Sequence, residues 1–566
     1  MRNNAGGLRK FVLRHEARSS TIQKKRMGRD GHSCDRFVPP DITIITGGTV
    51  TMVKRVVWQR FRAGILVAGF LWFLTSAGML PARETAPSRP NILFICVDDL
   101  KPVLGCYGDP IARTPNMDRL ARRGMRFELA FCNQAVCAPS RNDLMLGSRS
   151  TTIGIYGLSE NFRSAVPNAV TMPQYFMKYG YRTESVGKVF HVGHGNHDDP
   201  ASWSVPSVIE KVVEYVDPKN SANGQLTREE AYFTNQKLDQ IGRLPRGAAW
   251  EKLDVPDTAY ADGRIAEEGI KRLRAAKERL EKEGTPFFIA LGFVKPHLPF
   301  TAPKKYWDLY NPAEFRLATY QELPLGAPPI AGKRGGEILN YDPLSMENLK
   351  TDDIQRTLIH GYYAATSFAD AQIGKVLDEL DRLGLADSTI IVLWGDNGFH
   401  LGDHGIWTKH TNYEQAVRIP LIIVAPGITP PGSVTRQVAE NVDIFPTLAE
   451  LAGLPRPTGP QPIEGVSLVP ALRDPNARVD DHAYHCFPRG EVMGRAIRTE
   501  RYRLVEWKKI GAPTSTAQYE LYDYQTDPEE RENLVDKLPE VAQKLKAILA
   551  RYPEAAIPLA QRRKNR

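Results

Sequence analysis

Two pairs of oxygen-bearing side chains stand directly after apolar segments. Asp98 and Asp99 follow one such segment, and Asp396 and Asn397 follow another much later in the chain. Adjacent carboxylates repel each other unless a cation joins them, and a ligand set made only of oxygen atoms suits a hard divalent ion such as Ca²⁺. The four residues therefore predict a Ca²⁺ site, although either pair alone is equally well explained by solvated loop acids and a helix cap.

Lysine and histidine residues lie in short motifs that could act on a bound anion. Lys188 and His191 belong to Gly-Lys-Val-Phe-His, His297 ends Lys-Pro-His, and Lys409 stands thirteen positions after Asp396. Histidine can transfer protons near neutral pH, and lysine can neutralise charge that develops on a reacting group. A single lysine or histidine in a loop is more often solvated or structural, so the prediction depends on the whole set.

The pentapeptide Cys137-Ala-Pro-Ser-Arg141 is the third candidate. Taken alone, it is consistent with a turn after a buried cysteine, in which proline fixes φ and Ser140 caps the helix that follows. Together with the lysines above, Arg141 offers a further positive charge for an anionic reacting group.

Short apolar runs and helical periods predict the elements that hold these residues. The apolar runs have the length and composition of strands buried on both faces, at 91–97, 287–293, 389–394 and 420–425. Helical periodicity appears at 116–124, 172–179, 261–283, 360–383 and 442–453. This alternation predicts an α/β sandwich around a large, mostly parallel sheet. Ligands gather at the carboxyl ends of strands in such sheets, and Asp98, His297 and Asp396 fall there.

The motifs together resemble the sulfatase family. The likeness covers about residues 90–550 and rests on the five motifs at 98–99, 137–141, 187–191, 295–297 and 395–398. Within the family it is strongest to the iduronate-2-sulfatase branch, through the segments 97–102, 133–141 and 294–300. Asn397 stands where that branch has histidine and many other sulfatases have asparagine.

The resemblance implies an alkaline-phosphatase-like α/β/α sandwich and a specific chemistry. In the family, the motif cysteine is oxidised to formylglycine by a formylglycine-generating enzyme that reads Cys-x-Pro-Ser-Arg in an extended chain. The hydrated aldehyde then attacks a sulfate ester, here expected to be on a sulfated carbohydrate. The matching metal ligands for Ca²⁺ are Asp98, Asp99, Asp396, Asn397 and an oxygen of the residue formed from Cys137.

The remaining matched residues receive roles from the same resemblance. Arg141, Lys188 and Lys409 neutralise the sulfate, and His297 with Lys409 assists the departing alcohol. His191 deprotonates the second hydroxyl, which expels sulfate and regenerates the aldehyde. Two alternatives stay open: a phosphomonoester or phosphonate hydrolase of the same superfamily, and a glycan-binding relative without activity.

The segments beyond the central elements suggest a second domain. A proline-rich stretch at 454–463 resembles a linker, and strand-like, turn-rich and helical segments follow it at 495–507, 521–528 and 539–552. We therefore expect a catalytic domain at 90–455 and a smaller α+β domain at 464–555. The irregular stretches 202–256 and 303–349 are expected to form substrate-facing loops.

The start of the chain predicts export. Basic residues, an apolar stretch at 64–80 and small residues near 76–78 form the pattern of a signal peptide at 52–85. Cleavage would leave no stable membrane insertion, and residues 1–51 are expected to be a non-native or disordered extension. Residues 1–62 hold 14 of the 74 lysines and arginines and 4 of the 65 acidic residues, so the net charge of +9 belongs to this segment. A nucleic-acid partner is therefore not expected.

Overall fold

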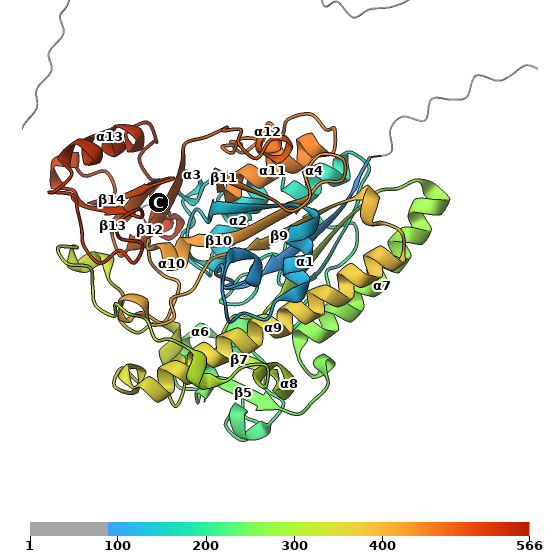
Figure 1. The fold of residues 1–566 in the computed structure, drawn as a ribbon, viewed down its shortest axis with the longest axis horizontal. Coiled ribbons are helices and arrows are strands. Elements are labelled where there is room, and N and C mark those ends of the chain that lie inside the picture. Colours follow the sequence, from blue (N-terminus) through green and yellow to red (C-terminus); the bar gives the residue numbers. More distant parts are fainter. Residues whose placement is uncertain (1–88, 565–566) are drawn as a thin grey trace, which may run out of the picture. The chain divides into compact units, whose positions relative to one another are not determined.

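A seven-stranded sheet lies at the centre of the computed structural model, which describes residues 89–564 (Figure 1). Its strand order is β11 (Ser433–Glu440), β2 (Met125–Phe131), β10 (Arg418–Val424), β9 (Thr389–Gly395), β1 (Asn91–Val97), β6 (Phe287–Phe293) and β3 (Arg182–Gly187). The strand pairs β1–β6, β1–β9, β3–β6 and β2–β11 are parallel, and β10 is antiparallel to both of its neighbours. This sheet confirms the predicted fold class.

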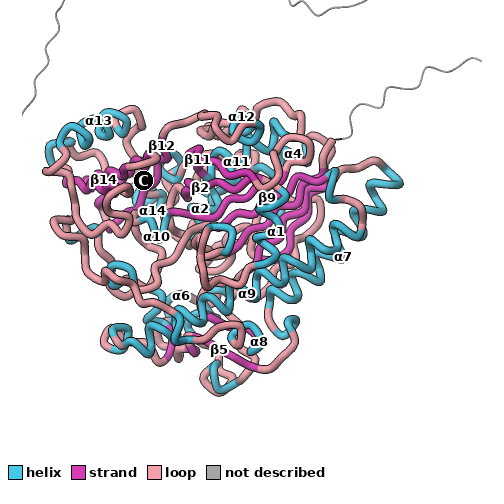
Figure 2. The backbone as a smooth tube through the Cα atoms, viewed as in Figure 1, coloured by secondary structure: helices cyan, strands magenta, loops and turns pink. Residues whose placement is uncertain are grey.

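Helices cover both faces of this sheet (Figure 2). Side chains of β1 alternate between two apolar cores, with Phe94 in one and Ile95 in the other. Strands buried on both faces explain the continuous apolar runs of the sequence. The Ile95 core includes α1 (Pro115–Arg123), α7 (Ala261–Glu283) and α9 (Asp352–Arg382), and the Phe94 core includes α2 (Cys137–Leu146), α4 (Met172–Lys178) and α11 (Asn441–Leu451).

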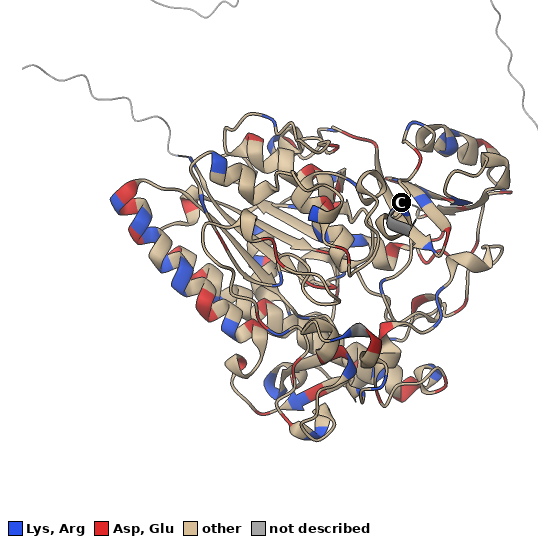
Figure 3. Cartoon of the chain, turned by 180° about the vertical axis from the view of Figure 1, so that it is seen from behind, with Lys and Arg blue, Asp and Glu red and all other residues tan. Residues whose placement is uncertain are grey.

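The outer face of α7 is polar. In Figure 3, positions of basic and acidic residues alternate along the ribbon of this helix. The pair Glu268 and Arg272 lies one turn apart, with Arg272 Nε 2.7 Å from Glu268 Oε1. Such spacing stabilises a solvated helix surface. The helix spans 261–283, as its apolar period predicts.

The sequence predicts some elements accurately and others only in part. The strands at 91–97 and 287–293 are confirmed residue for residue, whereas the helix expected from residue 360 begins at Asp352. Its first turn is exposed and acidic, so it shows no apolar period. The strand-like segment 495–507 is a hairpin of two strands, β13 (Val492–Thr499) and β14 (Tyr502–Lys509).

A second, four-stranded antiparallel sheet follows the main sheet. It consists of β12 (His482–Arg489), β13, β14 and β15 (Gln518–Asp523), and the helix α13 (Pro539–Leu549) packs on it. The amide of Cys486 on β12 donates to the carbonyl of Asn133, with N and O 2.8 Å apart, so this sheet lies beside the loop that leads into α2. The domain boundary near 455–464 remains a prediction.

Two further observations concern the described residues alone. Within 89–564, every helix is too short or too polar to cross a bilayer. Cys96, Cys106, Cys132, Cys137 and Cys486 are all unpaired thiols. The expected signal peptide at 52–85 and the extension at 1–51 lie outside the described residues.

Close approach of two glycines sets the spacing between β3 and β6. Gly187 pairs with Gly292, and the amide of Lys188 donates to the carbonyl of Gly292, with N and O 2.8 Å apart. A Cβ at Gly292 would lie 2.2 Å from the carbonyl carbon and oxygen of Lys188. The backbone of Lys188, the residue after β3, can therefore take this position only because Gly292 on β6 has no side chain.

We expect Gly292→Ala to lower the free energy of unfolding by about 3 kcal/mol or more, because the clashing atoms are backbone and cannot rotate away. Denaturant unfolding of the purified protein measures this change. Gly242→Ala is the matched control, because its φ is −59° and an added Cβ meets nothing within 4 Å. Equal stability of the two variants would contradict the steric argument.

Candidate active site

The four predicted metal ligands meet at the carboxyl ends of β1 and β9. Asp98, Asp99, Asp396 and Asn397 are each 0% exposed. The amide of Asp99 donates to Asp396 Oδ1 at 2.9 Å, and Asn397 Nδ2 donates to Asp99 Oδ1 at 2.8 Å. The register explains the meeting, because Val97 pairs with Gly395 on the parallel neighbour. Side chains that follow paired strand ends must lie close together.

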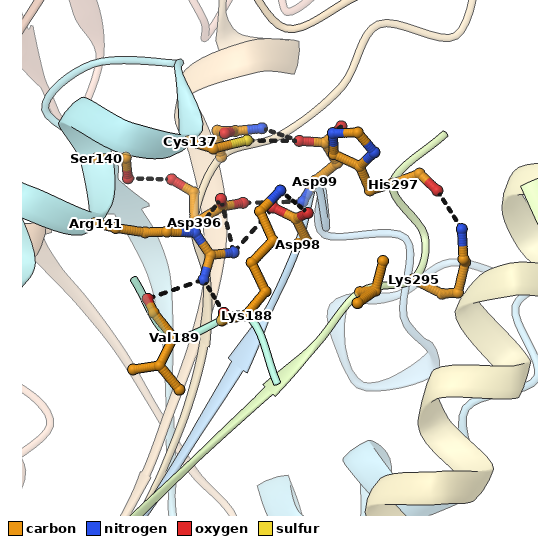
Figure 4. A network of polar contacts seen from close by, with 12 residues as sticks. Asp98, Asp99, Cys137, Ser140, Arg141, Lys188, Val189, Lys295, His297 and Asp396 are labelled. Atoms are coloured by element: carbon orange, nitrogen blue, oxygen red, sulfur yellow. Dashed lines mark hydrogen bonds and ion pairs between the residues drawn. The ribbon is translucent and has the colours of Figure 1, made fainter. Parts of the chain in front are cut away.

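Arg141 connects the ends of three strands (Figure 4). Its Nε donates to Asp396 Oδ2 at 3.0 Å and its Nη2 to Asp98 Oδ1 at 2.9 Å. Its Nη1 donates to the carbonyls of Lys188 and Val189, the latter at 3.1 Å. The guanidinium is fully buried and charged, and its planar fork suits two carboxylates at once.

The three carboxylates differ in pKa. Burial raises the pKa of Asp98, but the charges of Lys188 and Arg141 act against it, and the pKa lies well below its usual value. Burial raises the pKa of Asp99 to about 6 and that of Asp396 to about 7, although Lys409 and Arg141 act against it, and the neighbouring carboxylates add to the rise. Two of the three carboxylates are therefore harder to ionise than a free aspartate.

The donor set fits a hard divalent cation. Ligand atoms of Asp98, Asp99, Cys137 and Asp396 all lie within 4.8 Å of one another. Asn397 Oδ1 is buried without a hydrogen-bond partner, which is unusual for a buried carbonyl oxygen. A cation among these oxygens would relieve the repulsion between carboxylates and give Asn397 Oδ1 a partner.

Cys137 is the first residue of α2 and lies against the same cluster. Its Sγ is 3.7 Å from Asp99 Oδ1, and the residue is 1% exposed. Burial raises the pKa of the thiol well above its ordinary value, and Asp98 raises it further. The unmodified side chain is therefore a neutral thiol and a poor nucleophile.

Ser140 does not cap the helix that follows the pentapeptide. The helix begins at Cys137, so Ser140 lies inside its first turn. Its hydroxyl donates to the Asp396 carbonyl and accepts from Asn441 Nδ2 at 2.8 Å. The proline fits the first turn because it needs no amide donor there. Ser140 thus joins α2 to the end of β9.

The two predicted lysines pair with two different carboxylates of the cluster. Lys188 Nζ pairs with Asp98 Oδ2, and Lys409 Nζ lies 2.8 Å from Asp99 Oδ2. Burial lowers the pKa of each lysine, but the paired carboxylate outweighs it and raises the pKa overall. Both ammonium groups are therefore charged and close to the Cys137 thiol.

The two predicted histidines are buried and neutral. The Leu298 carbonyl lies 2.6 Å from His297 Nδ1 and can only accept, so Nδ1 carries the proton and Nε2 faces the carboxylates. Both ring nitrogens of His191 are buried without a hydrogen-bond partner. Burial lowers the pKa of both histidines well below the usual value, helped by Lys409 at His297 and Lys188 at His191.

Sequence reasoning missed two residues that border this site. Glu337 lies 3.2 Å from Lys409 Nζ and 3.5 Å from His297 Nε2, measured to its two carboxylate oxygens. The Phe233 ring packs against the His297 ring at 5.5 Å between centroids. Both come from the stretches expected to form substrate-facing loops, where the sequence has no periodic pattern to mark them.

Comparison with known proteins decides the family. A family model described as "Sulfatase" matches residues 90–454, and one described as "N-sulphoglucosamine sulphohydrolase, C-terminal" matches residues 402–554. The chain belongs to the sulfatase family. This confirms the resemblance predicted from the motifs. Among sulfatases, it is 34% identical over 550 residues to iduronate 2-sulfatase of Mus musculus, covering 84% of this chain and 96% of the relative.

Solved structures share the fold of this sulfatase. A protein solved with its substrate D-glucosamine-2-N,6-O-disulfate superposes with a TM-score of 0.63 at 22% identity, covering 82% of this chain and 97% of that one. A phosphonate monoester hydrolase of Agrobacterium radiobacter gives a TM-score of 0.62 at 21% identity, with 83% and 97% covered. The fold therefore occurs with more than one chemistry.

We expect Arg141→Ala to lower the free energy of unfolding by about 3–5 kcal/mol, because it leaves Asp98 and Asp396 buried without their shared cation. Chemical denaturation in metal-free buffer measures the loss. Arg436→Ala is the control, since the Arg436–Glu500 pair is half exposed and should contribute less than about 1 kcal/mol. A loss at Arg141 no larger than the control's would refute this role.

Proposed function

We propose that this sulfatase removes sulfate from a sulfated carbohydrate, with formylglycine made from Cys137 as its nucleophile and Ca²⁺ as its metal. The observation that carries the proposal is the position of Cys137, which begins a helix against three buried carboxylates. Its thiol is neutral and therefore unsuited to attack. Conversion to an aldehyde explains why a cysteine with so high a pKa occupies this point.

The metal would be held by Asp98, Asp99, Asp396, Asn397 and the oxygen that replaces Cys137 Sγ. When bound, Ca²⁺ supplies positive charge that makes a coordinated hydroxyl more acidic and stabilises negative oxygen. The three clustered carboxylates and the unpaired Asn397 Oδ1 support this choice.

The remaining residues would bind sulfate and move protons. Lys188 and Lys409 present charged ammonium groups beside Cys137, where a sulfate must lie. His297 Nε2 would face the leaving oxygen, since Nδ1 is held by the Leu298 carbonyl. His191, with two unpaired ring nitrogens, has the free capacity needed to accept a proton from a hydroxyl. Arg141 positions the carboxylates and does not need to touch substrate.

Relatives support a carbohydrate substrate, and the N-terminal sequence pattern supports export. The names iduronate 2-sulfatase and the complex with a disulfated glucosamine both concern sulfated sugars. The expected signal peptide at 52–85 supports secretion, and maturation would need a formylglycine-generating enzyme as partner.

Mass spectrometry of the peptide that contains Cys137 tests the nucleophile. In protein made with an active formylglycine-generating enzyme, we expect the mass of an aldehyde in place of the thiol. Cys137→Ala should abolish sulfate release while leaving the unfolding midpoint close to that of the native protein, because it removes one small buried atom. Full activity with an unmodified thiol would overturn the proposal.

Metal removal tests the Ca²⁺ site. We expect Ca²⁺ to raise the Tm of the chelator-treated protein, because an ion that binds only the folded state stabilises it by mass action. Asp396→Asn should lose most of that shift. Asp480→Asn is the control, because Asp480 belongs to a partly exposed acidic cluster beside His482 and outside this site. The same Ca²⁺ shift in Asp396→Asn as in the native protein would exclude this site.

Two alternatives are separable by assay. The fold shared with a phosphonate monoester hydrolase keeps a phosphoester or phosphonate reaction as the second candidate. Paired turnover of 4-nitrophenyl sulfate and 4-nitrophenyl phosphate should favour sulfate, and a preference for phosphate would select the second candidate. Binding of sulfated sugars without any turnover by the modified protein would indicate a glycan-binding relative.

A further inference from the structure

Three basic residues form a cluster beside Lys409 that the proposed chemistry does not use. We name Lys333, His410 and Arg489 the basic rim. Lys333 lies in the loop before the 3-10 turn Glu337–Asn340, His410 follows Lys409 directly, and Arg489 is the last residue of β12. All three are half-buried, whereas Lys188 and Lys409 are almost fully buried. The basic rim therefore lies nearer to solvent than the catalytic lysines.

A short contact joins Arg489 to His410, and Lys333 lies near Thr408 across Gly336. The guanidinium of Arg489 donates to the His410 carbonyl, with Nη2 and O 2.6 Å apart, and stacks 4.4 Å above the Phe487 ring. His410 Nδ1 lies 3.2 Å from Thr408 Oγ1. A Cβ at Gly336 would lie 3.4 Å from Lys333 Cε and 3.8 Å from Thr408 Oγ1, so both side chains lie against the backbone of Gly336.

The basic rim has no acidic partner among residues 89–564. Neither Lys333, His410 nor Arg489 forms an ion pair there, and Arg489 Nε is buried without a hydrogen-bond partner. Burial lowers the pKa of Arg489, and Glu520 is the carboxylate that acts against this shift. Its two oxygens already accept hydrogen bonds, one from Trp507 Nε1 at 2.6 Å and one from the Tyr522 hydroxyl at 2.5 Å. Glu337, next to Gly336, pairs with Lys409 through Oε2, and its Oε1 faces His297 Nε2 at 3.5 Å.

Holding these basic groups together in a half-buried place costs free energy. Burial lowers the pKa of Arg489 to about 10, and burial with the Arg489 charge lowers the pKa of Lys333. Burial lowers the pKa of His410 well below its usual value, and Lys409, Lys333 and Arg489 add to the effect. Like charges held together in a half-buried place repel, and a bound anion relieves the repulsion.

We propose that Lys333 and Arg489, with His410, form a subsite for a second anionic group of the substrate, a carboxylate or a further sulfate. The inference rests on the proposed function, because Lys409 links the basic rim to the place of the reacting sulfate. An arginine fork binds either anion in two hydrogen bonds, and a lysine adds charge without fixed geometry. The substrate class is therefore a sulfated sugar with a second negative charge on the same ring or the next one.

Steady-state kinetics test the subsite with substrates that differ in charge. D-glucosamine-2-N,6-O-disulfate and a sulfated uronic acid carry a second anion, and a monosulfated neutral sugar does not. The preferred substrate is the doubly charged sugar with the lower KM in the native protein. For this substrate, we expect Lys333→Gln and Arg489→Gln each to raise KM about tenfold, equivalent to about 1.4 kcal/mol. KM for the neutral sugar sulfate should change by much less. The preferred doubly charged sugar identifies the anion as sulfate or carboxylate.

Control variants separate recognition from general charge and from folding. Arg334→Gln removes an exposed charge next to Lys333 and should leave KM for every substrate within about twofold. Arg489→Lys keeps the charge but loses the fork, so it should recover only part of the affinity. Equal KM changes for doubly charged and neutral substrates, or an equal effect of Arg334→Gln, would overturn the subsite.

Binding without turnover separates this inference from the proposed function. In a Cys137→Ala background, calorimetry should show doubly charged sugars binding about tenfold more tightly than the neutral sugar sulfate, with the difference lost in Arg489→Gln. If the native protein, made with an active formylglycine-generating enzyme, releases no sulfate but the Cys137→Ala protein shows this binding difference, the subsite stands and the proposed activity fails. If sulfate is released and the difference is absent, the activity stands and the subsite fails.

Discussion

The fold around the site depends on one buried cation, Arg141, that holds two carboxylates and two carbonyls. Those groups come from the ends of β1, β9 and β3, so one side chain fixes three strand ends. One guanidinium and two ammonium groups face three carboxylates, yet burial still raises the pKa of Asp99 and Asp396. A further cation among these buried oxygens would favour their charged forms.

Sheet topology explains why residues so distant in sequence meet. β9, β1, β6 and β3 are parallel neighbours, so the residues that follow them share one edge of the sheet. Lys188, His297 and Asp396 reach the site for that reason. β10 is antiparallel between β9 and β2, which makes β2 run in the same direction as β9. The chain leaving β2 therefore enters α2 at the same edge and delivers Cys137 there.

The sequence was informative where local patterns and position agree. Buried strands read as apolar runs, and the acids after them mark the site, so Asp98 and Asp396 could be located from sequence. β3 could not be located from sequence, because Arg182, Thr183 and Glu184 interrupt its apolar pattern. In the structure, Glu184 pairs with Arg272 and Arg279 of α7. Glu337 and the basic rim come from irregular loops and a distant hairpin. Only the three-dimensional packing brings Arg489 within hydrogen-bond distance of His410.

Because Cys137 is buried in the folded protein, its proposed conversion to formylglycine must take place before folding is complete. At 1% exposure, inside a helix that packs against β9, the thiol is closed to a second enzyme once α2 has docked. Conversion must then compete kinetically with folding, and the fraction of active molecules is set by the ratio of the two rates. Because strands far apart in sequence must pair first, a sheet of this kind folds slowly. The same sheet topology that brings the site residues together would thus lengthen the time during which Cys137 is accessible for conversion.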